Sequence, residues 1–170
     1  MSSQLATLVL LKLRERAETV ATAESLTGGL LGGLLSDAPG ASESYVGGVI
    51  SYATRLKATL AGVHPATLRK LGPVAEQTAA EMANGVCERC QADWGLATTG
   101  VAGPETQDGH PVGEVFVAVA HPASGLLGVE ALLLTGDRAT IRSAAAAHAV
   151  RLVADALGIA VDAGRVTEET

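Results

Sequence analysis

Aromatic side chains are almost absent from this sequence, whose 170 residues include one Trp, one Phe and two Tyr. Hydrophobic residues nevertheless make up 48% of the chain, so the core must be built from Leu, Val, Ile and Ala. A chain of this length forms one domain and can bury a full core without disulfide or metal support. The composition therefore indicates a globular, single-domain protein with closely packed helices and strands.

Clusters of basic residues are also missing, and acidic residues outnumber basic ones by 18 to 12, giving a net charge of −6. A surface of this kind repels phosphate polymers, so nucleic acid is not expected as a direct partner. A small phosphorylated ligand stays compatible, because local donors outweigh the net charge within a Debye length of about 8–10 Å.

Long apolar runs do not occur, since no stretch reaches the roughly 18 apolar residues that a membrane-spanning helix needs. The longest candidate, residues 5–13, is short, contains Lys12 and has no basic segment before it. It predicts a first helix and not a signal peptide. We therefore expect a cytoplasmic protein that does not bind membranes.

Cysteine is scarce, and Cys87 and Cys90 form an isolated C-x-x-C. A zinc site needs four ligands, and the four histidines show no ligand spacing with each other or with the cysteines. Both cysteines fall late on the apolar stripe of a predicted helix. This pattern indicates buried helical thiols, and neither a metal nor an organic cofactor is expected.

Helical and β-strand patterns alternate along the chain, which is typical of an α/β fold. The last two predicted strands are joined by only a few residues and should form an antiparallel hairpin, so the sheet should be mixed. We expect a single-domain layered sandwich over residues 1–160, with helices covering the sheet, and a loose tail at 161–170. The predicted helices cover residues 4–18, 25–35, 54–60, 74–90 and 137–157, and the predicted strands 19–23, 46–53, 94–99, 113–120 and 126–135.

Two glycine-containing segments follow predicted strands and are candidates for a ligand site. Residues 23–29 (AESLTGG) lie between a strand and a helix, where unpaired N–H groups can bind an anion, while Gly32 and Gly33 give that helix a bare face for packing. Residues 98–104 (TTGVAGP) would let a ligand approach the backbone, although each segment could also be an ordinary turn. The polar loop after residue 104, with Glu105, Gln107, Asp108 and His110, could form a lid or rim.

Several common catalytic patterns are absent. No Gly-x-Ser-x-Gly, Walker or Gly-x-Gly-x-x-Gly motif occurs, which argues against an α/β-hydrolase, a P-loop protein and a dinucleotide-dependent reductase.

Lys57 follows a strand close to a Gly/Ser loop, although a solvated helix lysine is the simpler interpretation. Arg138 and Arg142 lie four apart at the start of the last helix, where the dipole disfavours cations. A bound anion, a salt bridge or an intersubunit contact would each account for them.

Six motifs in order extend over residues 5–157, and together they resemble the CinA carboxy-terminal family, which includes stand-alone nicotinamide-nucleotide amidases. The resemblance is to the short form, without the additional amino-terminal domain of longer CinA proteins. The motifs are Ala-Glu-Ser-x-Thr-Gly-Gly at 23–29, Pro-Gly-x-Ser at 39–42, Tyr-x4-Lys at 52–57, Thr-Gly-x-Ala-Gly-Pro at 99–104, Pro-Val-Gly-x-Val at 111–115 and Gly-Asp-Arg-x3-Arg at 136–142.

The resemblance implies hydrolysis of nicotinamide mononucleotide to nicotinate mononucleotide and ammonia, a salvage step in pyridine-nucleotide metabolism. Carried over by motif, Ser42 is the nucleophile, Lys57 its base and Tyr52 the group that keeps their geometry. Burial should lower the pKa of Lys57 to about 7–8, so that enough neutral amine exists at pH 7. Backbone N–H groups around 40–42 or 100–103 are the candidate oxyanion donors.

The expected partner is a small pyridine nucleotide, and the glycine faces with few aromatics make a homodimer plausible. A different class of function stays open: a catalytically silent nucleotide-binding module that regulates competence or the DNA-damage response, with Ser42 and Lys57 as mere polar lining. The predicted substrate-binding residues are Ser25, Thr27, Gly28, Gly29, Thr99, Gly100, Ala102, Gly103 and Arg142.

Overall fold

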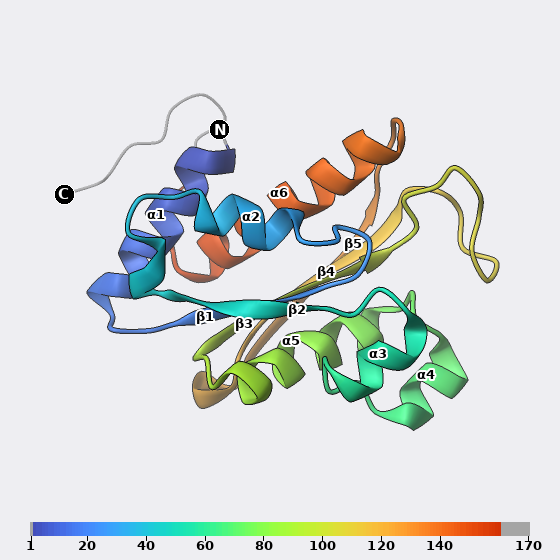
Figure 1. Cartoon of the computed structure of the whole chain (residues 1–170), viewed down its shortest axis with the longest axis horizontal. Helices are drawn as coiled ribbons and strands as arrows, with labels where there is room; N and C mark the ends of the chain where they lie inside the picture. Colours follow the sequence, from blue (N-terminus) through green and yellow to red (C-terminus); the bar gives the residue numbers. More distant parts are fainter. Residues whose placement is uncertain (1, 161–170) are drawn as a thin grey trace.

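The computed structural model describes residues 2–160, so the tail expected at 161–170 lies outside the described residues. Within this range no helix is both long and apolar enough to cross a membrane. Helices and strands alternate along most of the chain (Figure 1). The elements are α1 (Ser2–Glu15), β1 (Val20–Glu24), α2 (Leu30–Ser36), η1 (Ala41–Glu43), β2 (Tyr45–Ile50), α3 (Thr54–Thr59), α4 (Pro65–Leu71), α5 (Glu76–Cys90), β3 (Trp94–Gly100), β4 (Glu114–His121), η2 (Pro122–Ser124), β5 (Leu126–Leu133) and α6 (Arg138–Ala156).

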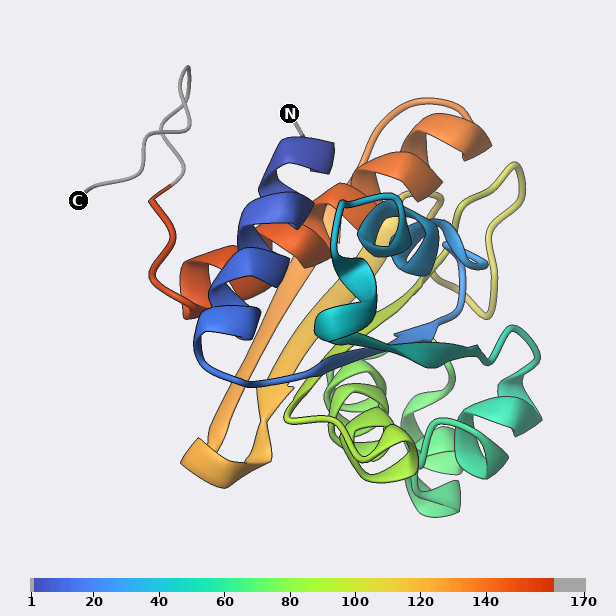
Figure 2. The same ribbon diagram turned by 60° about the vertical axis from the view of Figure 1, so that its left-hand side comes forward.

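One five-stranded mixed sheet organises the fold, with the strand order β2-β1-β3-β4-β5. The first three strands are parallel to one another, and β4 and β5 form the antiparallel hairpin that their short connection predicts. Figures 1 and 2 show α1, α2 and α6 on one face of the sheet and α3, α4 and α5 on the other. The predicted α/β sandwich with a mixed sheet is therefore confirmed.

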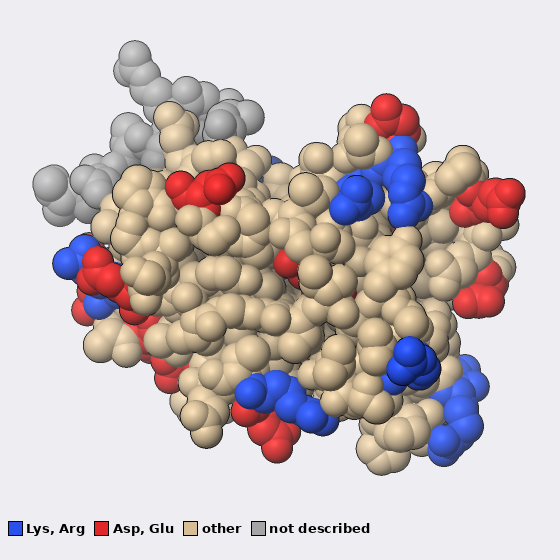
Figure 3. Space-filling view, viewed as in Figure 1, with Lys and Arg blue, Asp and Glu red and all other residues tan. Residues whose placement is uncertain are grey.

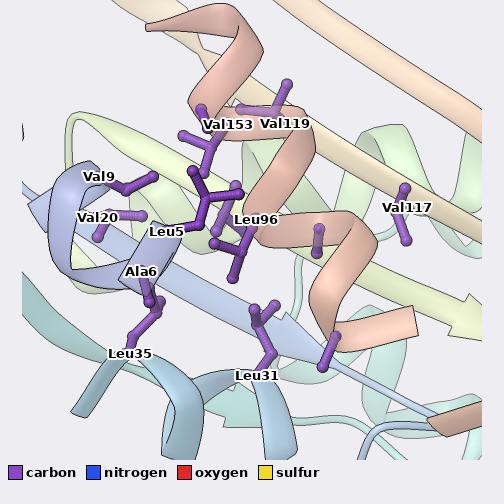
Figure 4. Packing of buried hydrophobic residues seen from close by; sticks show 14 of the residues in the cluster. Leu5, Ala6, Val9, Val20, Leu31, Leu35, Leu96, Val117, Val119 and Val153 are labelled. Carbon is purple, nitrogen blue, oxygen red and sulfur yellow. The ribbon is translucent and has the colours of Figure 1, made fainter. Parts of the chain in front are cut away.

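The two faces of the sheet bury different kinds of core. Leucine and valine fill the face under α1, α2 and α6, where Leu5, Leu31 and Val153 converge on Leu96 (Figure 4). Alanine dominates the face under α5, which can therefore lie close to the strands. The close approach explains how a domain of this size is filled with so few aromatic rings.

Helix α2 begins later than expected, because residues 25–29 form turns and not a first helical turn. Gly28 and Gly29 have φ angles of +56° and +99°, the left-handed region that glycine adopts without strain. Helix α4 is absent from the predicted helices, because a proline commonly ends a helical pattern. In the structure Pro65 is at the start of the helix, and the His64 side chain accepts a hydrogen bond from Ala66 N, so this proline begins a helix.

Both cysteines are free thiols in α5, where Cys87 is buried as the helical stripe predicts and Cys90 is only partly buried. Burial raises the pKa of the Cys87 thiol to about 11, so this group is protonated at neutral pH. Among the described residues, no group of three or more His, Cys, Asp or Glu side chains is arranged to hold a metal ion.

The parallel strands bring three loops to one edge of the sheet. Glu24, the last residue of β1, pairs with Ile50 at the end of β2 and with Thr98 near the end of β3. The segments that follow these strands therefore meet at the carboxyl edge, where α/β proteins bind their ligands.

Gly95 gives a direct test of the close contact between α5 and the sheet. A Cβ atom at this position would press on the backbone carbonyl of Ala83 in α5 and lie 2.7 Å from Cys87 Sγ. We expect Gly95→Ala to lower the free energy of unfolding by about 1–3 kcal/mol, the usual cost of overpacking, measured by urea denaturation. The matched control is Gly33→Ala, where nothing lies within 4 Å; it should be neutral or stabilising by up to about 1 kcal/mol. Equal effects of the two substitutions would contradict the close contact.

Candidate active site

Lys57 is the most unusual buried residue of the molecule, because its side chain is 1% exposed and has no carboxylate beside it among the described residues. Its Nζ atom donates to Ser25 Oγ at 2.8 Å and to the carbonyl of Ser51 at 2.9 Å, with a longer contact of 3.5 Å to the carbonyl of Tyr52. All three acceptors are neutral. Burial without a counter-charge lowers the pKa of Lys57 to about 8, so roughly a tenth of the amine is neutral at pH 7.

Ser25 is the side chain that the fold brings to this amine. It follows the last residue of β1, is 7% exposed, and its own N–H donates to the carbonyl of Thr98 at 2.9 Å. A neutral Lys57 can accept the proton of a serine hydroxyl 2.8 Å away, which is the arrangement of an activated oxygen nucleophile.

A cavity of about 330 Å³ opens over this pair, within the size range of small-molecule sites. Its walls come from the three loops at the carboxyl edge, from α3, from the segment before α5 and from the start of α6. The lining residues are Ser25, Leu26, Tyr52, Ala53, Thr54, Lys57, Pro73, Val74, residues 99–103, Glu105, Gln107 and Arg138.

Ser42 does not take part in this site, and the expected pairing of Ser42 with Lys57 is wrong in its geometry. Ser42 is an exposed residue of η1, which precedes β2, whereas Lys57 follows β2. The six residues of β2 separate the two ends by about 16 Å at roughly 3.3 Å per residue. Ser42 therefore lies at the opposite edge of the sheet, and so do the oxyanion donors expected around residues 40–42.

Tyr52 lines the cavity, but not in the expected role. Its phenol oxygen accepts a hydrogen bond of 2.8 Å from Arg138 Nη2, and only its backbone carbonyl contacts Lys57. The ring is 58% exposed at the cavity mouth. Arg138 also donates to the carbonyl of Gly103, so it connects two walls of the cavity. The arginine pair is the sequence signal that points to Arg138, but the expected ligand-binding residue of that pair is Arg142.

The amides at the end of the 25–29 segment are not available to a ligand, which corrects the expected anion site. Glu24 Oε2 accepts hydrogen bonds from Gly29 N and Leu31 N, and Glu24 Oε1 accepts one from Gly32 N. The protein's own carboxylate thus binds amides that could otherwise bind an anion. Thr27, Gly28 and Gly29 do not line the cavity over Lys57, and the Thr27 hydroxyl is instead within 2.7 Å of the Thr98 hydroxyl.

Arg142 likewise holds the protein and not the cavity. Its guanidinium donates from Nε to the carbonyl of Leu26 and from Nη2 to the carbonyl of Thr27, both at 2.8 Å. It does not line the cavity. Arg142 is therefore a residue that positions the Ser25 turn, and the prediction that it contacts a ligand is wrong for this structure.

The segment after β3 lies where the sequence predicts. Thr99, Gly100, Ala102 and Gly103 line the cavity, and the polar loop beyond them contributes Glu105 and Gln107 to its rim. The role of Ser25 beside Lys57 was missed, although its position directly after a predicted strand was the available signal.

Free backbone donors complete the chemistry of the site. The N–H groups of Leu26 and Thr27 have no hydrogen-bond acceptor among the described residues, although both residues are buried. The same holds for the N–H groups of Ala102 and Gly103. Unpaired buried amides are rare, and those of Leu26, Ala102 and Gly103, which line the cavity, are suited to an oxyanion.

Comparisons with known proteins agree with the motif pattern. The model of the CinA C-terminal domain matches residues 2–157. The chain is 48% identical over 141 residues to a CinA-like protein of Frankia casuarinae, covering 83% of this chain and 32% of that protein. It is 50% identical over 128 residues to a CinA-like protein of Synechocystis, covering 74% and 30%. The chain thus spans about a third of the length of these relatives.

Solved structures show the same fold. A CinA superfamily protein from Klebsiella pneumoniae aligns with a TM-score of 0.87 and 30% identity, covering 93% of this chain and 98% of that one. A competence/damage inducible protein from Agrobacterium tumefaciens aligns with a TM-score of 0.87 and 32% identity, covering 92% and 95%.

The lowered pKa of Lys57 predicts how stability depends on pH. The folded pKa of about 8 lies below the ordinary 10.5, so the unfolded chain binds more protons between these values and stability rises with pH through that window. Below pH 8, protonation of the buried amine lowers the free energy of unfolding by at most about 3 kcal/mol. Urea denaturation at pH 7 and pH 10 should show this rise in the wild type.

The rise should be missing from Lys57→Met, which removes the titrating group while keeping most of the volume. Lys70→Met, at an exposed position in α4, is the matched control and should keep the wild-type pH dependence. A rise of the same size in Lys57→Met would mean that other groups cause it.

Proposed function

The chain belongs to the CinA C-terminal domain family, and from this membership together with the buried Ser25–Lys57 pair we propose that it is an amidohydrolase. The proposed reaction converts nicotinamide mononucleotide to nicotinate mononucleotide and ammonia. The observation that carries the proposal is the 2.8 Å contact between a serine hydroxyl and a buried lysine that has only neutral partners. Burial disfavours the charged form of such a lysine, so a larger fraction of the amine is neutral at pH 7 and able to take the serine proton.

Acylation uses Ser25 as nucleophile and Lys57 as base. As Ser25 Oγ forms a bond to the carboxamide carbon, its proton moves to neutral Lys57 Nζ and the carbonyl π electrons move onto oxygen. The N–H group of Leu26, which lines the cavity and is free of other acceptors among the described residues, receives this oxyanion. The carbonyl re-forms as the C–N bond breaks, and Lys57 returns its proton to the leaving nitrogen, which departs as ammonia.

Deacylation repeats these steps with water. Lys57 takes a proton from the attacking water, the C–O bond to Ser25 breaks, and Ser25 Oγ recovers a proton as nicotinate mononucleotide leaves. The atoms balance with amide and water entering and acid and ammonia leaving. Each step uses only the Ser25–Lys57 pair and backbone amides.

The cavity rim supplies features that suit a pyridine nucleotide. Arg138 provides a planar guanidinium at the rim, a group suited to phosphate, and Figure 3 shows basic side chains near the start of α6. The exposed ring of Tyr52 can lie against the cationic pyridinium ring. Glu105 adds a negative charge on the same rim.

A catalytically silent regulatory module is the second candidate, favoured by the competence/damage name of the Agrobacterium protein. In that case the same cavity would bind a nucleotide without cleaving it. Nucleotide binding by the wild type without ammonia release would favour this candidate.

The first test measures ammonia release from nicotinamide mononucleotide by the wild type and three variants. Ser25→Ala and Lys57→Met should each lose about three or more orders of magnitude in kcat, because each removes one half of the reacting pair. Ser42→Ala, at the opposite edge of the sheet, is the matched control and should keep wild-type activity. Loss of activity in Ser42→Ala with Ser25→Ala unaffected would overturn the assignment of the nucleophile.

The second test is the pH dependence of kcat/KM. The base is active when neutral, and burial lowers the pKa of Lys57 to about 8. The rate should therefore rise about tenfold per pH unit below pH 8 and level off above it. Ser42→Ala should show the same profile at constant ionic strength, and a rate that falls from pH 6 to pH 8 would exclude Lys57 as the base.

A further inference from the structure

Glu24 is a buried carboxylate whose partners are backbone amides. Its side chain is 2% exposed and has no basic side chain within ion-pair distance among the described residues. It accepts hydrogen bonds of 2.9, 3.1 and 2.8 Å from the N–H groups of Gly29, Leu31 and Gly32. The Glu24 carboxylate therefore binds backbone amides that lie five to eight residues further along the chain.

The closed segment contains the proposed nucleophile. Ser25 is the next residue after Glu24, so the carboxylate and the end of β1 together fix both ends of the 25–29 turn. The left-handed backbone of Gly28 and Gly29 allows the chain to reverse within this span.

The backbone of Glu24 is connected to the other half of the reacting pair. Its carbonyl accepts a 2.8 Å hydrogen bond from the N–H of Ser51. The carbonyl of Ser51 in turn accepts from Lys57 Nζ at 2.9 Å. One residue thus holds the segment that carries Ser25 and the segment that orients Lys57.

Glu24 does not itself face the substrate cavity. Its side chain lines a separate cavity of about 240 Å³ between α2 and β2, which also includes Tyr45 and Gly48. It is not among the residues that line the cavity over Lys57. A change at Glu24 therefore acts on the reaction only through the geometry of its neighbours.

We propose that Glu24 is a positioning residue whose carboxylate, bound by the three amides, keeps Ser25 Oγ within hydrogen-bonding distance of Lys57. The effect of this inference on kcat rests on the proposed amidohydrolase function, whereas the position of Ser25 relative to Lys57 does not.

The hydrogen-bond pattern requires a carboxylate of this length. Two acceptor oxygens serve three N–H groups, and glutamine has one acceptor oxygen and an NH₂ group that would face a donor. Aspartate keeps both oxygens but is one methylene shorter. Glu24→Gln and Glu24→Asp therefore disturb the turn in two different ways while changing few atoms.

The test compares Glu24→Gln with Glu81→Gln. Glu81 is a matched control in α5, because its carboxylate also accepts three hydrogen bonds, from His64 N, Thr67 Oγ1 and Gln77 Nε2. We expect Glu24→Gln to lower kcat by about 10–100-fold, the usual effect of a displaced reacting group. KM should stay within about threefold. Glu81→Gln should lower the melting temperature and leave both constants unchanged.

An activity-independent measurement separates this inference from the proposed function. The titration of Lys57, followed by ¹⁵N NMR of its amine, should shift upward from a pKa of about 8 in Glu24→Gln, because an opened turn admits water to the amine. It should not shift in Glu81→Gln. If the wild type releases no ammonia but the Glu24→Gln shift occurs, the proposed function fails and the positioning role stands.

Unchanged kcat and an unchanged Lys57 titration in Glu24→Gln would overturn the proposal. If Glu24→Gln does not fold, Glu24→Asp provides the same two measurements, with the same expected directions. A folded Glu24→Asp protein with wild-type kcat and Lys57 titration would likewise overturn it.

Discussion

The contact between Lys57 Nζ and Ser25 Oγ is the interaction to which the rest of the structure is adjusted. A lysine that is 1% exposed and has only neutral acceptors carries a cost in stability whenever it is protonated. The cost is tolerated because the amine lies where three parallel strands end, with the two large core clusters on either side of the sheet to hold them in register. The same burial that weakens the fold makes the amine a base near neutral pH.

Two buried ionisable groups, Glu24 and Lys57, have opposite hydrogen-bonding surroundings at this site. The carboxylate of Glu24 accepts hydrogen bonds from three backbone N–H groups. Lys57 donates to two neutral oxygens and faces no anion, and its burial lowers its pKa and favours the neutral form. The turn that carries Ser25 is thus held by these three hydrogen bonds, while Lys57 is free to exchange a proton. Rigid support beside a titrating group is what proton transfer at a defined distance requires.

The sequence predicted the layers, the mixed sheet and the cavity wall at residues 99–103, because these follow from periodicity and from the position of small residues after a strand. It did not predict the reacting pair. Motif spacing along the chain does not say at which edge of a sheet a loop lies, and Ser42 precedes β2 whereas Ser25 follows β1. With β1 and β2 parallel, residues before one strand and after the other lie at opposite edges. The sequence pattern also does not show that Glu24 folds forward onto the amides of Gly29 and Gly32, which are therefore closed to the anion considered there.

The two arginines at the start of α6, which the helix dipole disfavours there, are explained by the carbonyl oxygens they meet. Arg142 donates to the carbonyls of Leu26 and Thr27, and Arg138 to the carbonyl of Gly103. One helix end therefore holds the loops after β1 and β3, two of the walls of the cavity, with one arginine to each. Arg138 differs in also reaching the phenol of Tyr52 at the mouth. A guanidinium has five N–H donors, so an anion can bind Arg138 without breaking the contacts that keep the walls of the cavity together.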